Sequence, residues 1–458
     1  MSRPASPSPP REVRDVYGRR YRVGESAREL LGYSRGWVPW AAGLAMLAAS
    51  VGQYGYAVLL PALAQTHGWT PAQGFWVLAI WAASQAATVY PVTRLRSRFG
   101  VPPSATMLAG AVLCATGLVT LGGSSNVVVV VVNHAILGGI GAGLIYGTGV
   151  GVVARWYPEH PARTYFVSGA FAYGSIPFVV LAGQLTGQGS VGSFLVVAGV
   201  AVLVLVGAAA VVLKDPPVHW WPAHIDPKLW AVDKSVNPGL RHNRPAVRHY
   251  SPAEVLRCPV SGLLYAAVLC AAAVALFNIA YVGMFTITSG WSAGFAATAV
   301  GVLAGASGVT RAAAGWAGDR FGRGRTVWAA LMAGGAAQLL LLVAGEFRLS
   351  VLLLAACGLA GASAGSCYAL LPGLVEDHFG DRAGLPNFGL FYGAKAVGAL
   401  LGVGLAAPLL VPNGYPAGFG IAALLSVSGA LFVGMLRRPG FPRLLLPDGN
   451  RRPATAGL

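Results

Sequence analysis

Apolar stretches of about 20 residues recur along the chain and are separated by short polar segments. At a rise of about 1.5 Å per residue, a helix of this length crosses the hydrocarbon core of a bilayer. The pattern predicts an all-α, polytopic membrane protein with twelve transmembrane helices. They are expected at residues 38–63, 74–92, 104–121, 127–153, 165–185, 191–213, 261–288, 292–315, 326–344, 351–375, 386–410 and 417–436.

A longer polar segment separates the first six predicted helices from the last six, which favours two pseudo-symmetric six-helix bundles. The expected parts are a cytoplasmic N-terminal tail (1–36), an N-terminal bundle (37–213), a cytoplasmic central linker (214–259), a C-terminal bundle (260–436) and a cytoplasmic C-terminal tail (437–458). Both tails are rich in Pro and Arg, so we expect them to be poorly ordered and to contact lipid headgroups. Within the linker, residues 219–230 are expected to lie at the membrane interface.

The composition and the charge add one prediction, the orientation of the chain in the membrane. Of 458 residues, 55% are apolar and 10% are charged, and the mean hydropathy is +0.62. The net charge of +17 is compatible with nucleic-acid binding, but most Lys and Arg residues lie in segments that share one side of the membrane. By the positive-inside rule, this places both termini in the cytoplasm. An Ala-, Gly-, Val- and Arg-rich composition suggests a bacterium. We therefore expect a multi-pass protein of the bacterial cytoplasmic (inner) membrane, with lipid and not nucleic acid around it.

The sequence contains no motif for catalysis, metal binding or nucleotide binding. Its five cysteines lack metal-ligand spacing, and no Walker-type phosphate loop is present. The apolar stretches hold neither paired carboxylates nor a histidine cluster, and the lone His134 is interpreted as a packing residue. We expect no enzymatic activity, no metal and no cofactor.

Short motifs recur in the two halves at one constant offset. Residues 98–100 (RFG) follow the second predicted helix, and residues 320–322 (RFG) follow the eighth. Tyr146 and Tyr368 are separated by the same offset, in the fourth and tenth helices. A shared offset in equivalent helices favours two parallel repeats related by an axis along the membrane normal, with a binding site between them.

Arg311 and Lys395 are the only Lys, Arg, Asp or Glu residues within the predicted spans. Such charges are costly in a membrane and typically line a substrate or ion path. The alternative is that the two cations snorkel toward the headgroups. At the repeat offset their counterparts are Val89 and Tyr173, so only the C-terminal half carries charge, which favours a functional role.

No acidic residue lies within a predicted span to neutralise these two cations, so the natural counter-ion is an anionic cargo. A small carboxylate fits a guanidinium and an ammonium. Closing the protein over two unpaired charges would be unfavourable, and an anion would relieve this cost. The pair therefore favours exchange of one anion for another by alternating access.

Several segments together resemble the oxalate/formate antiporter family of the major facilitator superfamily, which is related to the monocarboxylate porters. Residues 315–323 (GWAGDRFGR) resemble the superfamily's signature, while the first copy at 93–100 (TRLRSRFG) has Ser97 in place of the acid. The segments that resemble the narrower family are 56–73, 141–149 (GAGLIYGTG), 154–158 (ARWYP), 368–372 (YALLP) and 387–395 (NFGLFYGAK).

The resemblance implies roles for particular residues. Arg311 and Lys395 would bind the carboxylates. The cavity would be lined by Tyr146, Tyr392, Tyr368, Gln85, Gln53 and Tyr54, and the gating motif would comprise Gly315, Asp319, Arg320, Gly322 and Arg323. The oxalate carrier has Trp where this chain has Tyr392, which speaks against specialisation for oxalate.

Two other functions stay open. A proton-coupled monocarboxylate symporter is the closest, although animal members of that family carry an Asp where this chain has Ser307. A non-transporting membrane sensor is the other, but no signalling domain is recognisable in the loops. We expect the chain to function as a monomer.

Overall fold

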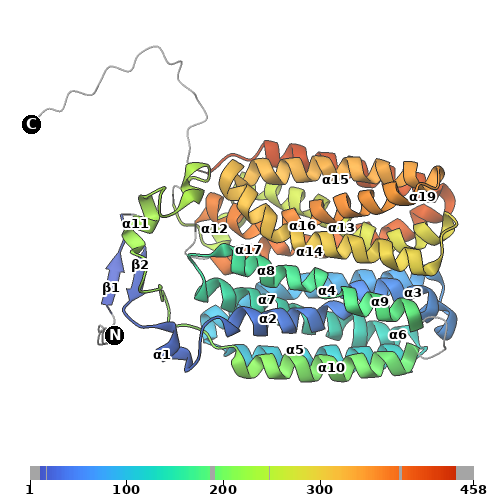
Figure 1. The fold of residues 1–458 in the computed structure, drawn as a ribbon, viewed down its shortest axis with the longest axis horizontal. Coiled ribbons are helices and arrows are strands. Elements are labelled where there is room, and N and C mark those ends of the chain that lie inside the picture. Colours follow the sequence, from blue (N-terminus) through green and yellow to red (C-terminus); the bar gives the residue numbers. More distant parts are fainter. Residues whose placement is uncertain (1–10, 17, 186–190, 247, 381–383, 440–458) are drawn as a thin grey trace, which may run out of the picture.

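The computed structural model describes residues 11–16, 18–185, 191–246, 248–380 and 384–439 (Figure 1). Within them, 12 helical segments are long and apolar enough to cross a membrane. The predicted helical membrane fold is therefore confirmed, and each segment overlaps one of the stretches chosen from the hydropathy pattern. The boundaries drawn between tails, bundles and linker stay a prediction.

Six of these segments precede the linker. Short polar caps start several of them: the Thr70 side chain accepts a hydrogen bond from the Gln73 backbone, and that of Asn126 from Val128 and Val129. The elements are α2 (Trp37–Ala49), η1 (Ser50–Gly52), α3 (Tyr54–His67), α4 (Pro71–Phe99), α5 (Pro103–Gly123), α6 (Val127–Val130), η2 (Val131–Gly138), α7 (Gly139–Trp156), α8 (Pro161–Tyr173), α9 (Ile176–Leu185) and α10 (Val191–Val212).

The other six segments follow the linker. The last two are joined within α19, where Gly414 leaves the helical conformation and marks the turn between them. The elements are α13 (Pro259–Thr288), α14 (Ala293–Phe321), α15 (Arg323–Glu346), α16 (Ser350–Phe379), α17 (Gly384–Tyr392), α18 (Ala394–Ala399), η4 (Leu400–Leu405) and α19 (Ala406–Gly434).

The helices before the linker and those after it form two groups that lie side by side (Figure 1). Helix α4 packs against α17, α18 and η4, and α8 and α9 pack against α14. Two glycines allow this close approach. A Cβ at Gly389 would lie 2.8 Å from the Tyr90 Cα, and one at Gly308 would lie 2.3 Å from the Tyr173 ring.

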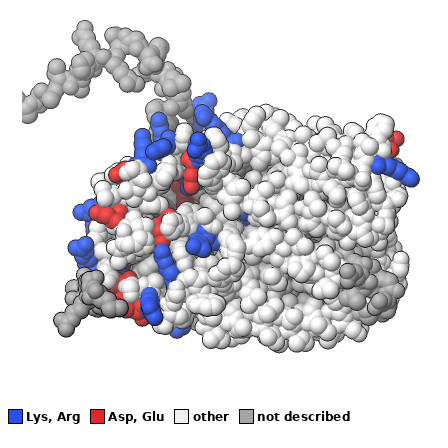
Figure 2. All heavy atoms as spheres, in the orientation of Figure 1, with Lys and Arg blue, Asp and Glu red and all other residues white. Residues whose placement is uncertain are grey.

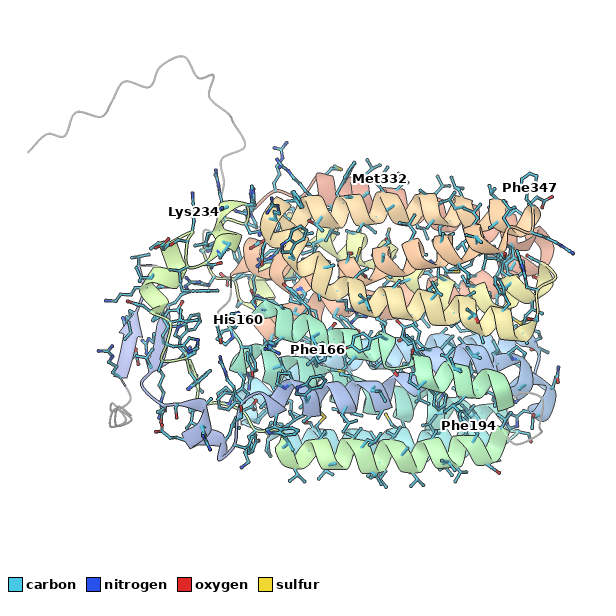
Figure 3. All side chains as sticks on the ribbon, in the orientation of Figure 1. His160, Phe166, Phe194, Lys234, Met332 and Phe347 are labelled. Atoms are coloured by element: carbon cyan, nitrogen blue, oxygen red, sulfur yellow. The ribbon has the colours of Figure 1, made fainter. Side chains whose placement is uncertain are left out.

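Apolar side chains cover the outside of the helical region. Met332 lies on the outer edge of α15, and Phe347 at the end opposite the β-hairpin (Figure 3). Most of the charged side chains on the face shown in Figure 2 gather at the other end, which we call the charged end, over the linker and the N-terminal segment. His160 and Lys234 lie there (Figure 3). Such an apolar outer surface suits contact with the hydrocarbon core of a bilayer.

The N-terminal segment is folded in its described part, contrary to the expectation of a poorly ordered tail. Strands β1 (Arg11–Arg14) and β2 (Arg20–Val23) form an antiparallel hairpin, and α1 (Ala27–Leu31) follows. The physical reason is an ion pair inside the turn, where the Arg19 guanidinium lies 2.6 Å from the buried Asp15 carboxylate. Residues 1–10 and the C-terminal tail from 440 lie outside the described residues.

The start of the linker packs against this hairpin. The Arg22 backbone N–H donates to the His219 carbonyl, and the Trp221 N–H donates to that of Arg22. Trp220 and Trp221 are each 5% exposed. Protein therefore covers both rings, because β2 pairs with the segment that carries them, and the expected interfacial position of residues 219–230 stays a prediction. The linker continues through α11 (Pro227–Val232), η3 (Pro238–Arg241) and α12 (Pro252–Leu256).

The linker also reaches both helix groups. Asp215 pairs with Arg96 of α4 at 2.7 Å and with Arg155 of α7 at 3.2 Å. Further along, the Asn243 amide donates to the Gly318 carbonyl, and its oxygen accepts from the Arg323 backbone, both at 2.9 Å. The linker is therefore part of the packed structure at the charged end.

Candidate functional site

Arg311 of α14 and Lys395 of α18 reach one buried site between the two helix groups. They are 3% and 2% exposed. The Arg311 Cζ lies 5.5 Å from the centroid of the Tyr368 ring, and the Lys395 Nζ lies 5.9 Å from the same centroid. Two cations from different helices thus share one aromatic ring, and a cation near a ring face is stabilised by it.

The Lys395 ammonium is bound by side chains of the first helix group. It donates to the Gln85 Oε1 at 2.9 Å, to the Gln53 Oε1 at 3.1 Å and, at 3.5 Å, to the hydroxyl of neighbouring Tyr392. Gln53 stands where the first span is interrupted between η1 and α3, and Lys395 follows a similar break at Gly393. Both polar side chains therefore extend from interrupted helices, a recurring feature of transporter binding sites.

Arg311 is held by α8, through a residue that the sequence did not single out. Its guanidinium donates to both the backbone carbonyl and the hydroxyl of Ser168. The Tyr146 hydroxyl lies 3.4 Å from the same Ser168 Oγ. A backbone carbonyl as a ligand leaves no trace in the side-chain pattern, so that pattern alone could not point to Ser168.

Aromatic side chains surround the two cations. The rings of Tyr146 and Tyr392 stack with centroids 5.0 Å apart, and Tyr368 lies 6.3 Å from Tyr392. Phe171 of α8, which the sequence analysis also missed, meets Tyr146 edge-on at 5.6 Å and lies 5.8 Å from the Lys395 Nζ. Thus the repeat-related Tyr146 and Tyr368 both contact the ring of Tyr392.

The structure brings together most of the residues chosen from the sequence. Gln53, Gln85, Tyr146, Tyr368 and Tyr392 contact one or both cations or one another, as described above. Tyr54 is buried beside Gln53 at the start of α3, with 2% exposure. Among the described residues, neither cation has a carboxylate within ion-pair distance.

Several buried polar atoms here have no hydrogen-bond partner among the described residues. They are Gln85 Nε2, Arg311 Nε, Tyr368 OH and Ser307 Oγ. All four can donate a hydrogen bond, and the first three belong to side chains that contact the cations. Buried donors without acceptors are costly, so this arrangement suits a species that is rich in acceptor oxygens.

The two helix groups are packed together on both sides of this site. Toward the charged end, a Cβ at Gly315 would lie 2.4 Å from the Tyr165 ring of α8. Toward the opposite end, the rings of Phe75 in α4 and Tyr281 in α13 are 4.3 Å apart. The site is thus enclosed by contacts between α4 and α13 and between α8 and α14.

The residues expected to form a gating motif lie at the charged end, and the shortest ion pair among them uses an acid outside that set. Arg323 lies 2.7 Å from Asp377 of α16 but 3.9 Å from Asp319. Gly322 has a φ of 98°, which favours glycine, and Arg320 lies over the ring of Trp316 at 5.7 Å.

Other candidate chemistry is not supported in the described part of the chain. No group of three or more His, Cys, Asp or Glu residues there could hold a metal ion. His134 is 1% exposed and stacks on Tyr56 with centroids 5.7 Å apart, as a packing residue would.

A membrane protein in which two groups of six helices enclose a buried polar site has the form of a secondary transporter, and the comparisons with known proteins agree. The Major Facilitator Superfamily model matches residues 42–387, so the chain belongs to this superfamily. It is 25% identical over 317 residues to the "Oxalate:formate antiporter" of Oxalobacter formigenes, covering 67% of this chain and 69% of that protein. This relative confirms the family resemblance found in the sequence.

Solved structures show the same fold. A D-xylose-proton symporter superposes with a TM-score of 0.64 at 15% identity, covering 88% of this chain and 98% of that one. A POT family transporter in complex with 5-aminolevulinic acid has a TM-score of 0.64 at 11% identity, with coverages of 89% and 97%. At these identities the likeness concerns the fold and not the cargo.

Proposed function

We propose that this protein exchanges small carboxylate anions across the membrane by alternating access. The observation that carries the proposal is the pair of buried cations, Arg311 and Lys395, which share the Tyr368 ring and have no carboxylate partner among the described residues. A carboxylate placed between them would accept hydrogen bonds from a guanidinium and an ammonium, the strongest donors that side chains offer. The similarity to an oxalate:formate antiporter supports the same class of cargo.

The unpartnered donors fit this cargo. The Gln85 Nε2, the Arg311 Nε and the Tyr368 hydroxyl need acceptors, and a carboxylate supplies them. Stacked tyrosines would enclose the carbon skeleton of a small anion. With Tyr392 in place of a larger indole, the proposal is for a small carboxylate in general and not for oxalate in particular.

The proposal includes an orientation and a location. The Lys and Arg residues gathered at the charged end support placing this end, and both termini, in the cytoplasm (Figure 2). The location would be the inner membrane of a bacterium, and the proposed functional unit is a single chain.

Counterflow in proteoliposomes tests the proposal. Vesicles are loaded with unlabelled mono- or dicarboxylates, and the entry of labelled oxalate, formate and lactate is followed. If the protein exchanges anions, uptake of the labelled anion will depend on the internal anion and will disappear in Lys395→Ala. The control is Lys234→Ala, in an exposed lysine of the linker. Uptake into anion-free vesicles that is driven by external acid would instead indicate proton-coupled symport and contradict exchange.

A further inference from the structure

Every described hydrogen-bond acceptor on the two cations, apart from neighbouring Tyr392, belongs to the first helix group. Lys395 donates to the amide oxygens of Gln53 and Gln85, and Arg311 donates to the carbonyl and hydroxyl oxygens of Ser168. Both cations themselves belong to the second helix group. The hydrogen bonds that satisfy them are therefore also bonds between the two groups.

The acceptors are neutral, so unlike a carboxylate they do not change the net charge of the site. An ammonium has three donors, and two amide oxygens with one hydroxyl occupy them. These dipoles offset part of the cost of burying the charge but leave the net charge of the site unchanged. An anionic cargo would neutralise the charge, and it would compete with the amide oxygens for the same donors.

We propose that Gln53, Gln85 and Ser168 form an internal ligand set that takes the place of cargo carboxylates on Lys395 and Arg311. With these ligands in place the helix groups can close without an anion, so the carrier reorients at a low but finite rate when unloaded. Exchange is then fast but not obligatory, and the internal ligands set the rate of net transport. This inference rests on the proposed function and adds the residues that determine how strictly transport is coupled.

Gln85 is the most informative position, because its Oε1 makes the shortest of these bonds to Lys395 and the side chain is fully buried. Leucine has a similar size and no acceptor, so Gln85→Leu leaves the ammonium less satisfied whenever cargo is absent. Glutamate adds a permanent carboxylate, so Gln85→Glu pairs with Lys395 and competes with cargo. The two substitutions are expected to change the coupling in opposite directions.

The experiment compares two rates in the same proteoliposomes. Exchange is measured with equal anion on both sides, and net efflux is measured into anion-free buffer while K⁺ and valinomycin prevent a membrane potential from building up. Oxalate and formate serve as probes. The ratio of net efflux to exchange is expected to fall by about tenfold or more in Gln85→Leu, the effect of losing one hydrogen bond to a charged group. In Gln85→Glu the ratio is expected to rise, while exchange itself slows.

Gln338 provides the matched control. It is a fully buried glutamine in α15, donates to the Gly334 carbonyl and lines a different cavity, within the second helix group. Gln338→Leu and Gln338→Glu should leave the ratio at its wild-type value. A ratio that is equal in wild type, Gln85→Leu and Gln85→Glu would overturn the inference while leaving exchange intact. Absence of carboxylate exchange in the wild type would instead overturn the proposed function.

A distance measurement keeps the inference testable if a variant does not transport. Spin labels at Val128 and Val351, both exposed and at the end opposite the charged end, report the separation of the two groups. In anion-free nanodiscs the two labels of the wild type are expected to show a population with a short separation. In Gln85→Leu this population should be absent without anion and should return when oxalate is added. A short distance in Gln85→Leu without anion would contradict the inference.

Discussion

The Arg96 guanidinium of α4 donates to both carboxylate oxygens of Asp215, at 2.8 and 2.7 Å. Residues 93–100 lack the acid of the superfamily signature, since Ser97 occupies its position. Arg96 is not the signature's arginine, because its counterpart at the repeat offset is Gly318. Its ion pair is a separate contact that joins α4 to the segment between the halves.

We expect Asp215→Asn to destabilise the protein by about 1–3 kcal/mol, because the Arg96 side chain is 2% exposed and would lose its counter-ion. The apparent unfolding temperature in detergent measures the effect. The control is Asp233→Asn, in a partly exposed linker acid whose side chain bonds only to nearby Ser235 among described side chains. Equal unfolding temperatures for the two variants would show that the pair contributes nothing.

Arg311 is expected to require its guanidinium and not only its charge. In Arg311→Lys the charge stays, but one ammonium cannot both reach Ser168 and bind a carboxylate in the forked geometry. Exchange should fall by at least about tenfold, the effect of losing one charge-assisted hydrogen bond. Arg257→Lys, at an exposed arginine, is the control for the same substitution. Wild-type exchange in Arg311→Lys would show that charge alone is sufficient.

Two glycines of the same helix test the close packing between the two helix groups. Gly308 and Gly301 both lie in α14, but an added Cβ would meet the Tyr173 ring at 2.3 Å from Gly308 and nothing within 4 Å from Gly301. Gly308→Ala should therefore reduce exchange strongly, and overpacking should cost about 1–3 kcal/mol of stability. Gly301→Ala should match the wild type. If both variants exchange normally, the two groups do not approach as closely as described.

The N-terminal hairpin is expected to be sensitive to acid. Burial raises the pKa of Asp15, but hydrogen bonds and charge from Arg19 and a hydrogen bond from Tyr21 outweigh it, so that its pKa lies below the usual 3.8. Because the folded pKa is lowered, the carboxylate stabilises the hairpin above pH 3.8, and this contribution is lost as the pH falls further.

Trp221 offers a readout for this transition, since its ring lies 5.0 Å from that of Tyr21. Its fluorescence, in a variant with the other tryptophans replaced, should change below pH 3.8. Asp15→Asn should show the acid-state signal already at neutral pH. A signal that is flat with pH in the wild type would mean that Asp15 does not hold the hairpin together.

The sequence by itself determined the membrane architecture, the repeat and the two central cations. Twelve apolar stretches, an interrupting polar linker and the isolated charges at Arg311 and Lys395 are local features, and a helix in lipid satisfies its own backbone. For this reason the number and approximate position of the helices follow from hydropathy. The equivalent positions of Tyr146 and Tyr368 in the two halves were likewise visible as a constant offset.

Only the tertiary structure decided which residues contact one another. Ser168 binds Arg311 partly through a backbone carbonyl, Asp377 replaces Asp319 as the main partner of Arg323, and Asp215 pairs with Arg96 across 119 positions. Such contacts depend on the packing of helices that are distant in the sequence, which no local pattern encodes. The contact between the hairpin and the linker was missed for the same reason, since it joins Arg22 to His219 and Trp221.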